Sequence, residues 1–372
     1  MNTPHTEEAF FALLRAGLWE DDVRLLPYGA IDLAAILDMA KGQAVVGLVA
    51  AGLEHIADAK PPKSDVMPFV VHTFMLEQRN QAMNRFIGVA TEKMRKAGIE
   101  TLLVKGQAVA QCYERPLWRV SGDVDLFMSD DNYVKAKRFL TPLASSVEEE
   151  HVREKHLALT LDSWEVELHA RLYCGISPRI DRELDDVYAD SFGGGNVRTW
   201  DNNGVQVLLL AVENDVFYVF THIMQHFYKG GIGLRQICDW CRLMWTYRHT
   251  MDLHKLEARL RRAGLMTSWR AFAAFAVGWL GMEPSAVPFY SDEPRWRRKA
   301  ARIKDFVVMS GNFGHNRDNT YYGKYPYVVR KAFSLARRMG DVVRHARIFP
   351  ADALRFMPTI VLHGVRSALR GE

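Results

Sequence analysis

Apolar and polar positions follow two different periods along this chain, and the period changes twice. Over the first 97 residues, and again beyond residue 204, apolar residues recur at the three- and four-residue spacing of an amphipathic helix. Between these regions, short segments either alternate or run apolar for a few residues, as strands do. The pattern therefore predicts a helical region, then a strand-rich segment, then a second helical region.

The individual elements can be placed by residue number. Before residue 98 the pattern predicts helices over 6–15, 31–41 and 66–97. The middle segment is expected to hold a helix over 132–140 and strands over 101–104, 122–127, 147–151, 157–161 and 164–169. Beyond residue 204 the pattern predicts helices over 205–228, 234–248, 253–263, 267–280 and 296–309. A loop over 310–327 and a last pair of helices are expected to follow.

These elements predict an α+β fold. A small mixed sheet is expected at 98–200, flanked by a helical N-terminal region at 1–97 and a helical C-terminal region at 201–372. The 372 residues, with 48% hydrophobic and 25% charged positions, match an ordinary globular protein, which excludes a disordered chain.

Two carboxylates lie one residue apart in the apolar segment 122–127. Because side chains alternate along a strand, Asp123 and Asp125 should share one face while Val124 faces the other. Like charges this close repel each other unless a cation lies between them, and carboxylate oxygens suit Mg²⁺. The pattern indicates a seat for a metal-bound nucleoside triphosphate. The alternative is a pair of turn residues or a solvated strand end.

The residues after the apolar run 101–104 suit a phosphate group. Lys105 supplies a cation, and Gly106 opens a predicted helix whose free backbone N–H groups a phosphate can approach closely.

A third carboxylate comes from the alternating segment 164–169. Glu165, Glu167 and His169 share one face of this predicted strand. A carboxylate beside an Asp pair is what a two-metal site requires. The alternative is a half-exposed edge strand with solvated charges.

Three motifs together resemble a known family. In chain order they are Leu103-Val104-Lys105-Gly106, Arg119-Val120-Ser121-Gly122-Asp123-Val124-Asp125-Leu126 and Glu167-Leu168-His169-Ala170-Arg171-Leu172. They resemble the uncharacterised nucleotidyltransferase family of the DNA polymerase β-like superfamily. The later residues His222, His226, Gly233-Leu234-Arg235 and Asp239 are similar to the helical half of that family.

The resemblance implies a fold and a reaction. The fold is a nucleotidyltransferase-type mixed sheet, and the reaction moves a nucleoside monophosphate from a nucleoside triphosphate to an acceptor hydroxyl or similar group. Two Mg²⁺ ions would be held by Asp123, Asp125 and Glu167. Glu167 would also act as the general base or assist it, and Glu165 is the alternative third carboxylate.

The resemblance also implies which residues bind the nucleotide. Lys105 and the Gly106 backbone would meet the β- and γ-phosphates. On a regular strand, Arg119 shares a face with Ser121 and the Asp pair, and it is the expected clamp because a guanidinium binds phosphate oxygens in pairs. The chain departs from the wider superfamily at Gln107, which offers no hydroxyl to a phosphate.

Four residues of the helical half leave alternatives open. His222 and His226 lie one helical turn apart and are expected to be structural, to line a cleft or to hold a metal. Arg235 and Asp239 are expected to form an intrahelical pair.

Cysteine use and targeting signals point to the cytoplasm. The four cysteines include one Cys-x-x-Cys spacing, and without a second such pair we expect reduced, buried thiols. The first twenty residues carry acidic groups where a signal peptide would be basic, and no apolar run reaches the length of a membrane span.

The net charge of +4 conceals a basic C-terminal third, where Lys and Arg outnumber Asp and Glu from Arg295 onward. Such a surface could hold nucleic acid, and solvated helix faces are the simpler interpretation. Three functions stay open: a nucleotidyltransferase with a small-molecule, nucleic-acid or protein acceptor, a toxin-like modifier of tRNA or protein, and a non-catalytic nucleotide-binding module. The sequence does not distinguish among ATP, CTP, GTP and UTP as the donor. It does not indicate the oligomeric state either.

Overall fold

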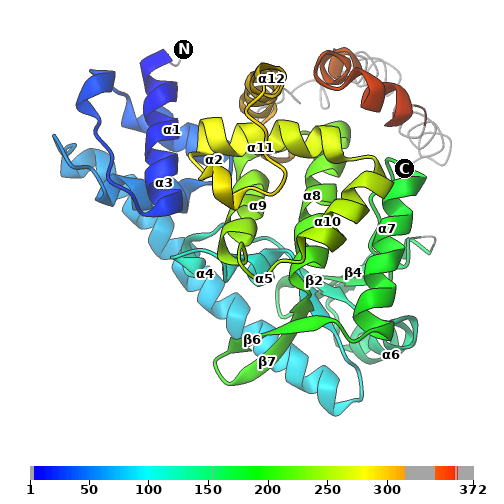
Figure 1. The fold of residues 1–372 in the computed structure, drawn as a ribbon. Helices are drawn as coiled ribbons and strands as arrows, with labels where there is room; N and C mark the ends of the chain where they lie inside the picture. The colour runs from blue at the N-terminus through cyan, green and yellow to red at the C-terminus, as the bar shows by residue number, and fades with distance from the viewer. Residues whose placement is uncertain (1–3, 153, 315–339, 357, 359–372) are drawn as a thin grey trace, which may run out of the picture.

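A seven-stranded mixed sheet lies at one end of the molecule, with helices on both faces (Figure 1). The computed structural model describes residues 4–152, 154–314, 340–356 and 358. The predicted α+β class, a mixed sheet flanked by helical regions, is confirmed.

The strand order is β3-β4-β5-β2-β1-β7-β6. β2 runs parallel to β5 and β1 runs parallel to β7, whereas the other neighbours are antiparallel. The bounds are β1 (Leu102–Val104), β2 (Val124–Phe127), β3 (Ser146–Val147), β4 (His156–Leu161), β5 (Trp164–His169), β6 (Val197–Asn202) and β7 (Val205–Leu210).

The helices form an N-terminal group, a group around the sheet and a C-terminal group. The N-terminal helices are α1 (Pro4–Trp19), α2 (Leu33–Gly42), α3 (Val46–Glu54) and the long α4 (Lys63–Lys96). Those within the sheet region are α5 (Gly106–Ala110), α6 (Asp130–Leu140) and α7 (Pro178–Tyr188). The C-terminal helices are α8 (Val212–Lys229), α9 (Leu234–Thr246), α10 (Leu253–Ala263), α11 (Met266–Leu280) and α12 (Pro294–Ser310). Among the described residues, no helix is both long and apolar enough to cross a bilayer.

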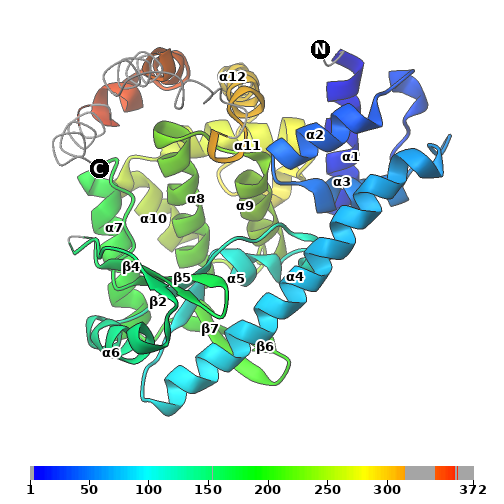
Figure 2. The ribbon, with the colours of Figure 1, turned by 180° about the vertical axis from the view of Figure 1, so that it is seen from behind.

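The two faces of the sheet contribute to two separate cores. Val124 and Leu126 of β2 pack with Val166 and Leu168 of β5 in a core that includes residues of α4 and α6. Phe127 belongs instead to the larger core of the helical half. Figure 2 shows α4 running obliquely past the sheet, with α8 and α9 above it. Because strand side chains alternate, the polar positions of β2 and β5 point toward α8 and α9.

The sequence prediction was wrong at several elements. Residues 205–210 form β7, not the start of a helix, and α8 begins only at Val212. Asn203 and Gly204, both with positive φ, form the two-residue turn between β6 and β7, and Asn-Gly is a strong hairpin signal. The predicted division at residue 200 falls inside β6. Helices α3 and α7 and strand β6 were not predicted, and the predicted strand 147–151 is only the short β3 at Ser146–Val147. Most of the predicted loop 310–327 lies outside the described residues.

Helices α1 and α3 pack at a distance that only glycine allows. A Cβ atom at Gly17 would lie 1.8 Å from the carbonyl oxygen of Leu48, and one at Gly52 would lie 2.0 Å from that of Leu13. The helix backbones therefore touch without intervening side chains.

We predict that Gly17→Ala lowers the free energy of unfolding by about 2 kcal/mol, because the added methyl group forces the helices apart. This loss should occur although alanine is the better helix former by about 1 kcal/mol. Gly278→Ala is the matched control, since Gly278 is exposed in α11 and nothing lies within 4 Å of its Cβ position. Urea unfolding should show opposite signs for the two variants. An equal gain in both would contradict the packing argument.

Candidate active site

Strand register brings three carboxylates together. β2 and β5 are parallel neighbours in which Asp125 pairs with Glu167, and Asp123 directly precedes β2. Ligand oxygens of these three residues lie within 4.8 Å of one another. Glu165 is exposed and lies outside this group. The structure therefore places Glu167, rather than Glu165, beside the Asp pair.

Lys105 reaches this group from the adjacent strand. Val104 at the end of β1 pairs with Asp125, and the next residue places its Nζ atom 2.6 Å from Asp125 Oδ1. Lys105 has φ 55° and ψ −145°, a combination that is rare outside glycine and typical of functional sites. This bend turns the chain from β1 into α5. Because α5 has only five residues, its N-terminus adds less positive dipole than the sequence led us to expect.

Two histidines contact the carboxylates from β5 and β4. Nε2 of His169 lies 3.0 Å from Asp125 Oδ1 and 3.2 Å from Glu167 Oε2. His156 pairs with His169 across the β4–β5 hairpin, and its Nε2 lies 3.4 Å from the same Glu167 oxygen. Sequence reasoning missed His156. The hairpin register that places it opposite His169 was the signal available.

These contacts set the charge state of the group. Burial alone would lower the pKa of Lys105, but Asp125 and its neighbours hold that pKa well above the ordinary value. Burial acts to raise the pKa of Glu167, yet contacts with His156 and His169 hold it well below the usual range. Burial and the Asp125 charge raise the pKa of Asp123. Lys105 thus serves as a counterion for the carboxylates.

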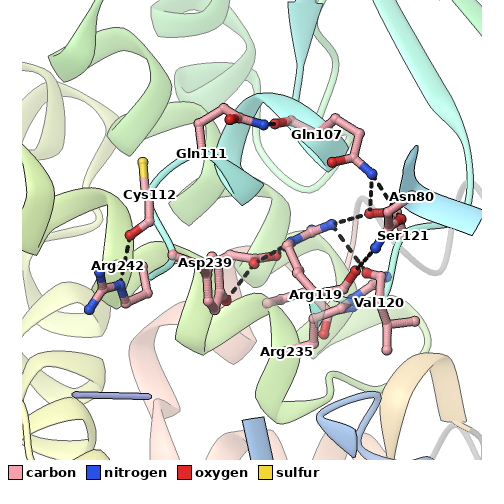
Figure 3. A network of polar contacts seen from close by, with 12 residues as sticks. Asn80, Gln107, Gln111, Cys112, Arg119, Val120, Ser121, Arg235, Asp239 and Arg242 are labelled. Atoms are coloured by element: carbon pink, nitrogen blue, oxygen red, sulfur yellow. Dashed lines mark hydrogen bonds and ion pairs between the residues drawn. The ribbon is translucent and has the colours of Figure 1, made fainter. Parts of the chain in front are cut away.

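A buried polar network fixes the loop that leads into β2 (Figure 3). Arg119 donates from Nε and Nη2 to the two carboxylate oxygens of Asp239 in α9, each at 2.7 Å. Tyr113 donates to Asp239 as well, also at 2.7 Å. Asn80 of α4 donates to the carbonyl oxygens of Leu117 and Arg119. The loop is therefore tied to α4 and to α9 at once.

This network changes the roles expected for two residues. The fork of Arg119 is occupied by Asp239, so it cannot clamp phosphate in pairs without breaking a buried ion pair. The Ser121 hydroxyl accepts hydrogen bonds from Gln107 and Arg119 inside the network and is not among the cavity-lining residues. The expected intrahelical pair of Arg235 with Asp239 is replaced by the Arg119–Asp239 pair, and Arg235 Nη1 donates to the Val120 carbonyl oxygen.

The carboxylate group opens into a cavity of about 220 Å³ between the sheet and the helices. Its lining residues are Lys105, Gly106, Val109, Arg119, Gly122, Asp123, Asp125, Glu167, Val219, His222, His226, Arg235, Gln236 and Asp239. A larger cavity of about 470 Å³ lies beside α11 and Phe349, but its lining contains a single carboxylate, Asp352, and no acidic pair. The smaller cavity is therefore the candidate active site.

His222 and His226 of α8 line the helical wall of this cavity. Their Nε2 atoms lie 2.6 Å apart, so one imidazole donates to the other. Burial and the Lys105 charge hold the pKa of His222 well below its ordinary value and lower that of His226 to about 3. Both rings are neutral near pH 7. Of the expected alternatives, the structure places the pair at the cleft.

Breaking the Arg119–Asp239 pair should be costly. We predict that Asp239→Asn lowers the free energy of unfolding by about 3–5 kcal/mol, because it leaves the Arg119 charge buried without its partner. Glu257→Gln is the control, since the Glu257–Arg261 pair is exposed on α10 and should contribute about 0.5 kcal/mol or less. Urea unfolding of both variants measures this difference. Similar losses would contradict the assignment.

The buried histidines should make stability depend on pH. The unfolded chain takes up a proton at His226 below about pH 6.5, whereas the folded chain does so only near its pKa of about 3. Stability should therefore fall on acidification, by up to about 1.4 kcal/mol per pH unit for this residue. We predict that His226→Gln loses less stability than the parent protein between about pH 7 and about pH 5. Equal losses in urea unfolding would contradict this.

Comparisons with known proteins identify what this chain is similar to. A solved structure of an antigenic nucleotidyltransferase-like protein from Paracoccidioides brasiliensis is 16% identical, covers 55% of this chain and 95% of its own, and has a TM-score of 0.33. No curated protein matches the chain. The model of the family described as "Uncharacterised nucleotidyltransferase" matches residues 29–281, which include every motif of the site. The chain therefore belongs to the uncharacterised nucleotidyltransferase family, as its sequence motifs predicted.

Proposed function

We propose that this protein transfers a nucleoside monophosphate from a nucleoside triphosphate to an acceptor, with Mg²⁺ bound at Asp123, Asp125 and Glu167. The observation that carries the proposal is the convergence of these three carboxylates in one cavity with the cations Lys105 and Arg235. Cations and carboxylates that line one cavity suit a substrate that is itself a metal–polyphosphate complex. Membership of the nucleotidyltransferase family supports the reaction class.

The donor set fits a hard divalent cation. All three ligand groups are carboxylates, their oxygens lie close together, and Asp123 carries a raised pKa because burial and Asp125 disfavour its charge. A divalent cation would relieve that repulsion. Two ions would also need the phosphate oxygens of the nucleotide. When bound, Mg²⁺ supplies neutralisation of the charge that develops on the transferred phosphoryl group.

The protein side chains would then act by position and charge. Lys105 and Arg235 would contact phosphate oxygens as separate cations, in place of the paired clamp expected of Arg119. The low pKa of Glu167 keeps its carboxylate ionised but makes it a weak base. Glu167 is therefore better suited to bind a metal and orient the attacking group than to accept a proton from that group. His222 and His226 on the opposite wall would face the acceptor.

The basic C-terminal region gives little support to a nucleic-acid acceptor. Arg295 and Arg297 pair with the carboxylates of Glu293 and Asp292, and Lys304 pairs with Glu7. These described residues of α12 and its surroundings therefore have local counterions, as solvated helix faces do. A nucleic-acid partner stays a prediction from sequence.

The test is a thermal-shift screen with the four nucleoside triphosphates, each with and without Mg²⁺. A ligand that binds only the native state, present at a concentration of about 100 times its Kd, stabilises the folded protein by about 2.7 kcal/mol. We expect a Mg²⁺-dependent rise in Tm with at least one triphosphate. Asp123→Asn should lose this rise while its own Tm stays at or above that of the parent protein, because a like charge is removed.

Glu165→Gln is the control, since Glu165 lies on β5, the strand of Glu167, but outside the carboxylate group. It should keep the shift. Asp125→Asn is less informative, because it removes a charge that neutralises the buried Lys105. The absence of a shift with every triphosphate, or a full shift in Asp123→Asn, would overturn the proposal.

A further inference from the structure

A second group of ligand atoms converges on the other side of Glu167. His156, Glu167 and His169 each offer one ligand atom, and these atoms lie within 4.8 Å of one another. This group differs chemically from the carboxylate group because two of its three ligands are imidazole nitrogens. Imidazole suits Zn²⁺ and other transition metals, whereas Mg²⁺ selects oxygen.

The spacing of these atoms suits metal coordination better than direct hydrogen bonding. Charge-assisted N–H···O⁻ bonds are about 2.7–2.9 Å long, but Glu167 Oε2 lies 3.2 Å from Nε2 of His169 and 3.4 Å from Nε2 of His156. With metal–ligand bonds of about 2.1 Å, neighbouring ligand atoms are about 3.0 Å apart in an octahedral site and about 3.4 Å apart in a tetrahedral site. The Glu167 oxygen already lies at about that separation from each of the two nitrogens.

The histidine rings are also arranged for this purpose. His156 and His169 stack with centroids 4.8 Å apart and an angle of 27° between their planes, and each points Nε2 at the same carboxylate oxygen. Nε2 of His156 is shielded from solvent and has no hydrogen-bond partner among the described residues. A buried ring nitrogen without a hydrogen bond is a costly arrangement that a cation would relieve.

We propose that His156, Glu167 and His169 bind a divalent transition metal, of which Zn²⁺ is the best match to two imidazoles and a carboxylate. Glu167 belongs to both groups and would bridge this ion and the one on the Asp pair. Asp125 lies beside this group but outside it, and its Oδ1 atom is hydrogen-bonded to His169 Nε2 at 3.0 Å and paired with Lys105 at 2.6 Å. Metal binding at this site requires no nucleotide, so it goes beyond the proposed function. Either of the two can be absent while the other is present.

The experiment measures metal binding by the full chain in excess Mg²⁺. Equilibrium dialysis against Zn²⁺ should leave one ion per chain, and Co²⁺ as a spectroscopic probe should give a visible absorption band typical of imidazole ligation. His156→Ala is the main variant, since His156 lies on β4, is partly exposed and has Glu167 as its ion-pair contact, so the fold should survive. Loss of a direct ligand should weaken Zn²⁺ binding at least as much as the 10–100-fold typical of outer-shell partners, that is by about 100-fold or more.

Three controls locate the ion. His151→Ala removes an exposed imidazole that stacks on His156 but lies outside the group, and it should bind as the parent protein does. Asp123→Asn should also retain Zn²⁺ while losing the Mg²⁺–triphosphate shift, which separates this site from the proposed function. His222→Ala should retain Zn²⁺ as well. No Zn²⁺ binding by the parent protein, unchanged binding in His156→Ala, or loss in His222→Ala instead would overturn the proposal.

Discussion

Repulsion among three carboxylates is the constraint around which the site is built. Asp123, Asp125 and Glu167 are held together by strand pairing, which the sheet cannot adjust without losing its register. The protein offsets the resulting cost with Lys105 and His169, both of which contact Asp125. The strained backbone at Lys105 follows from this need, because the bend is what carries its ammonium group to the acidic strand.

The helical half of the protein holds the site from the other side. Asp239 of α9 binds Arg119, whose loop runs directly into the acidic strand, and Asn80 of α4 binds the same loop through two carbonyl oxygens. The geometry at Asp123 therefore depends on helices that are far away in the sequence. The proposed nucleotidyl transfer would depend on accurate positioning of its reactants, which such rigid support favours.

The sequence was most informative where the relevant physics is local. Alternation around Val124 and Val166 was enough to place Asp125, Glu167 and His169 on one face, because a one-residue slip would turn all three side chains into the apolar core. The partner of Arg119 was not predictable in this way, since Asp239 lies 120 positions away and only the folded chain brings the two together. The β6–β7 hairpin was missed for a different reason. Its Asn203-Gly204 turn was visible, but the apolar run after it continued into α8 and was assigned to one helix.

The parallel pairing of β1 with β7 has a consequence for how the chain folds. β1 is an inner strand of only three residues, yet one of its neighbours, β7, is made about a hundred residues later. During synthesis, that edge of β1 stays without its partner until β7 has been made. Pairing β1 with β7 therefore requires the entropy loss of closing a long loop, and β1 is the strand that leads into Lys105. The candidate active site therefore cannot be completed before β7 has been made, and folding aids that protect an open sheet edge would act at this stage.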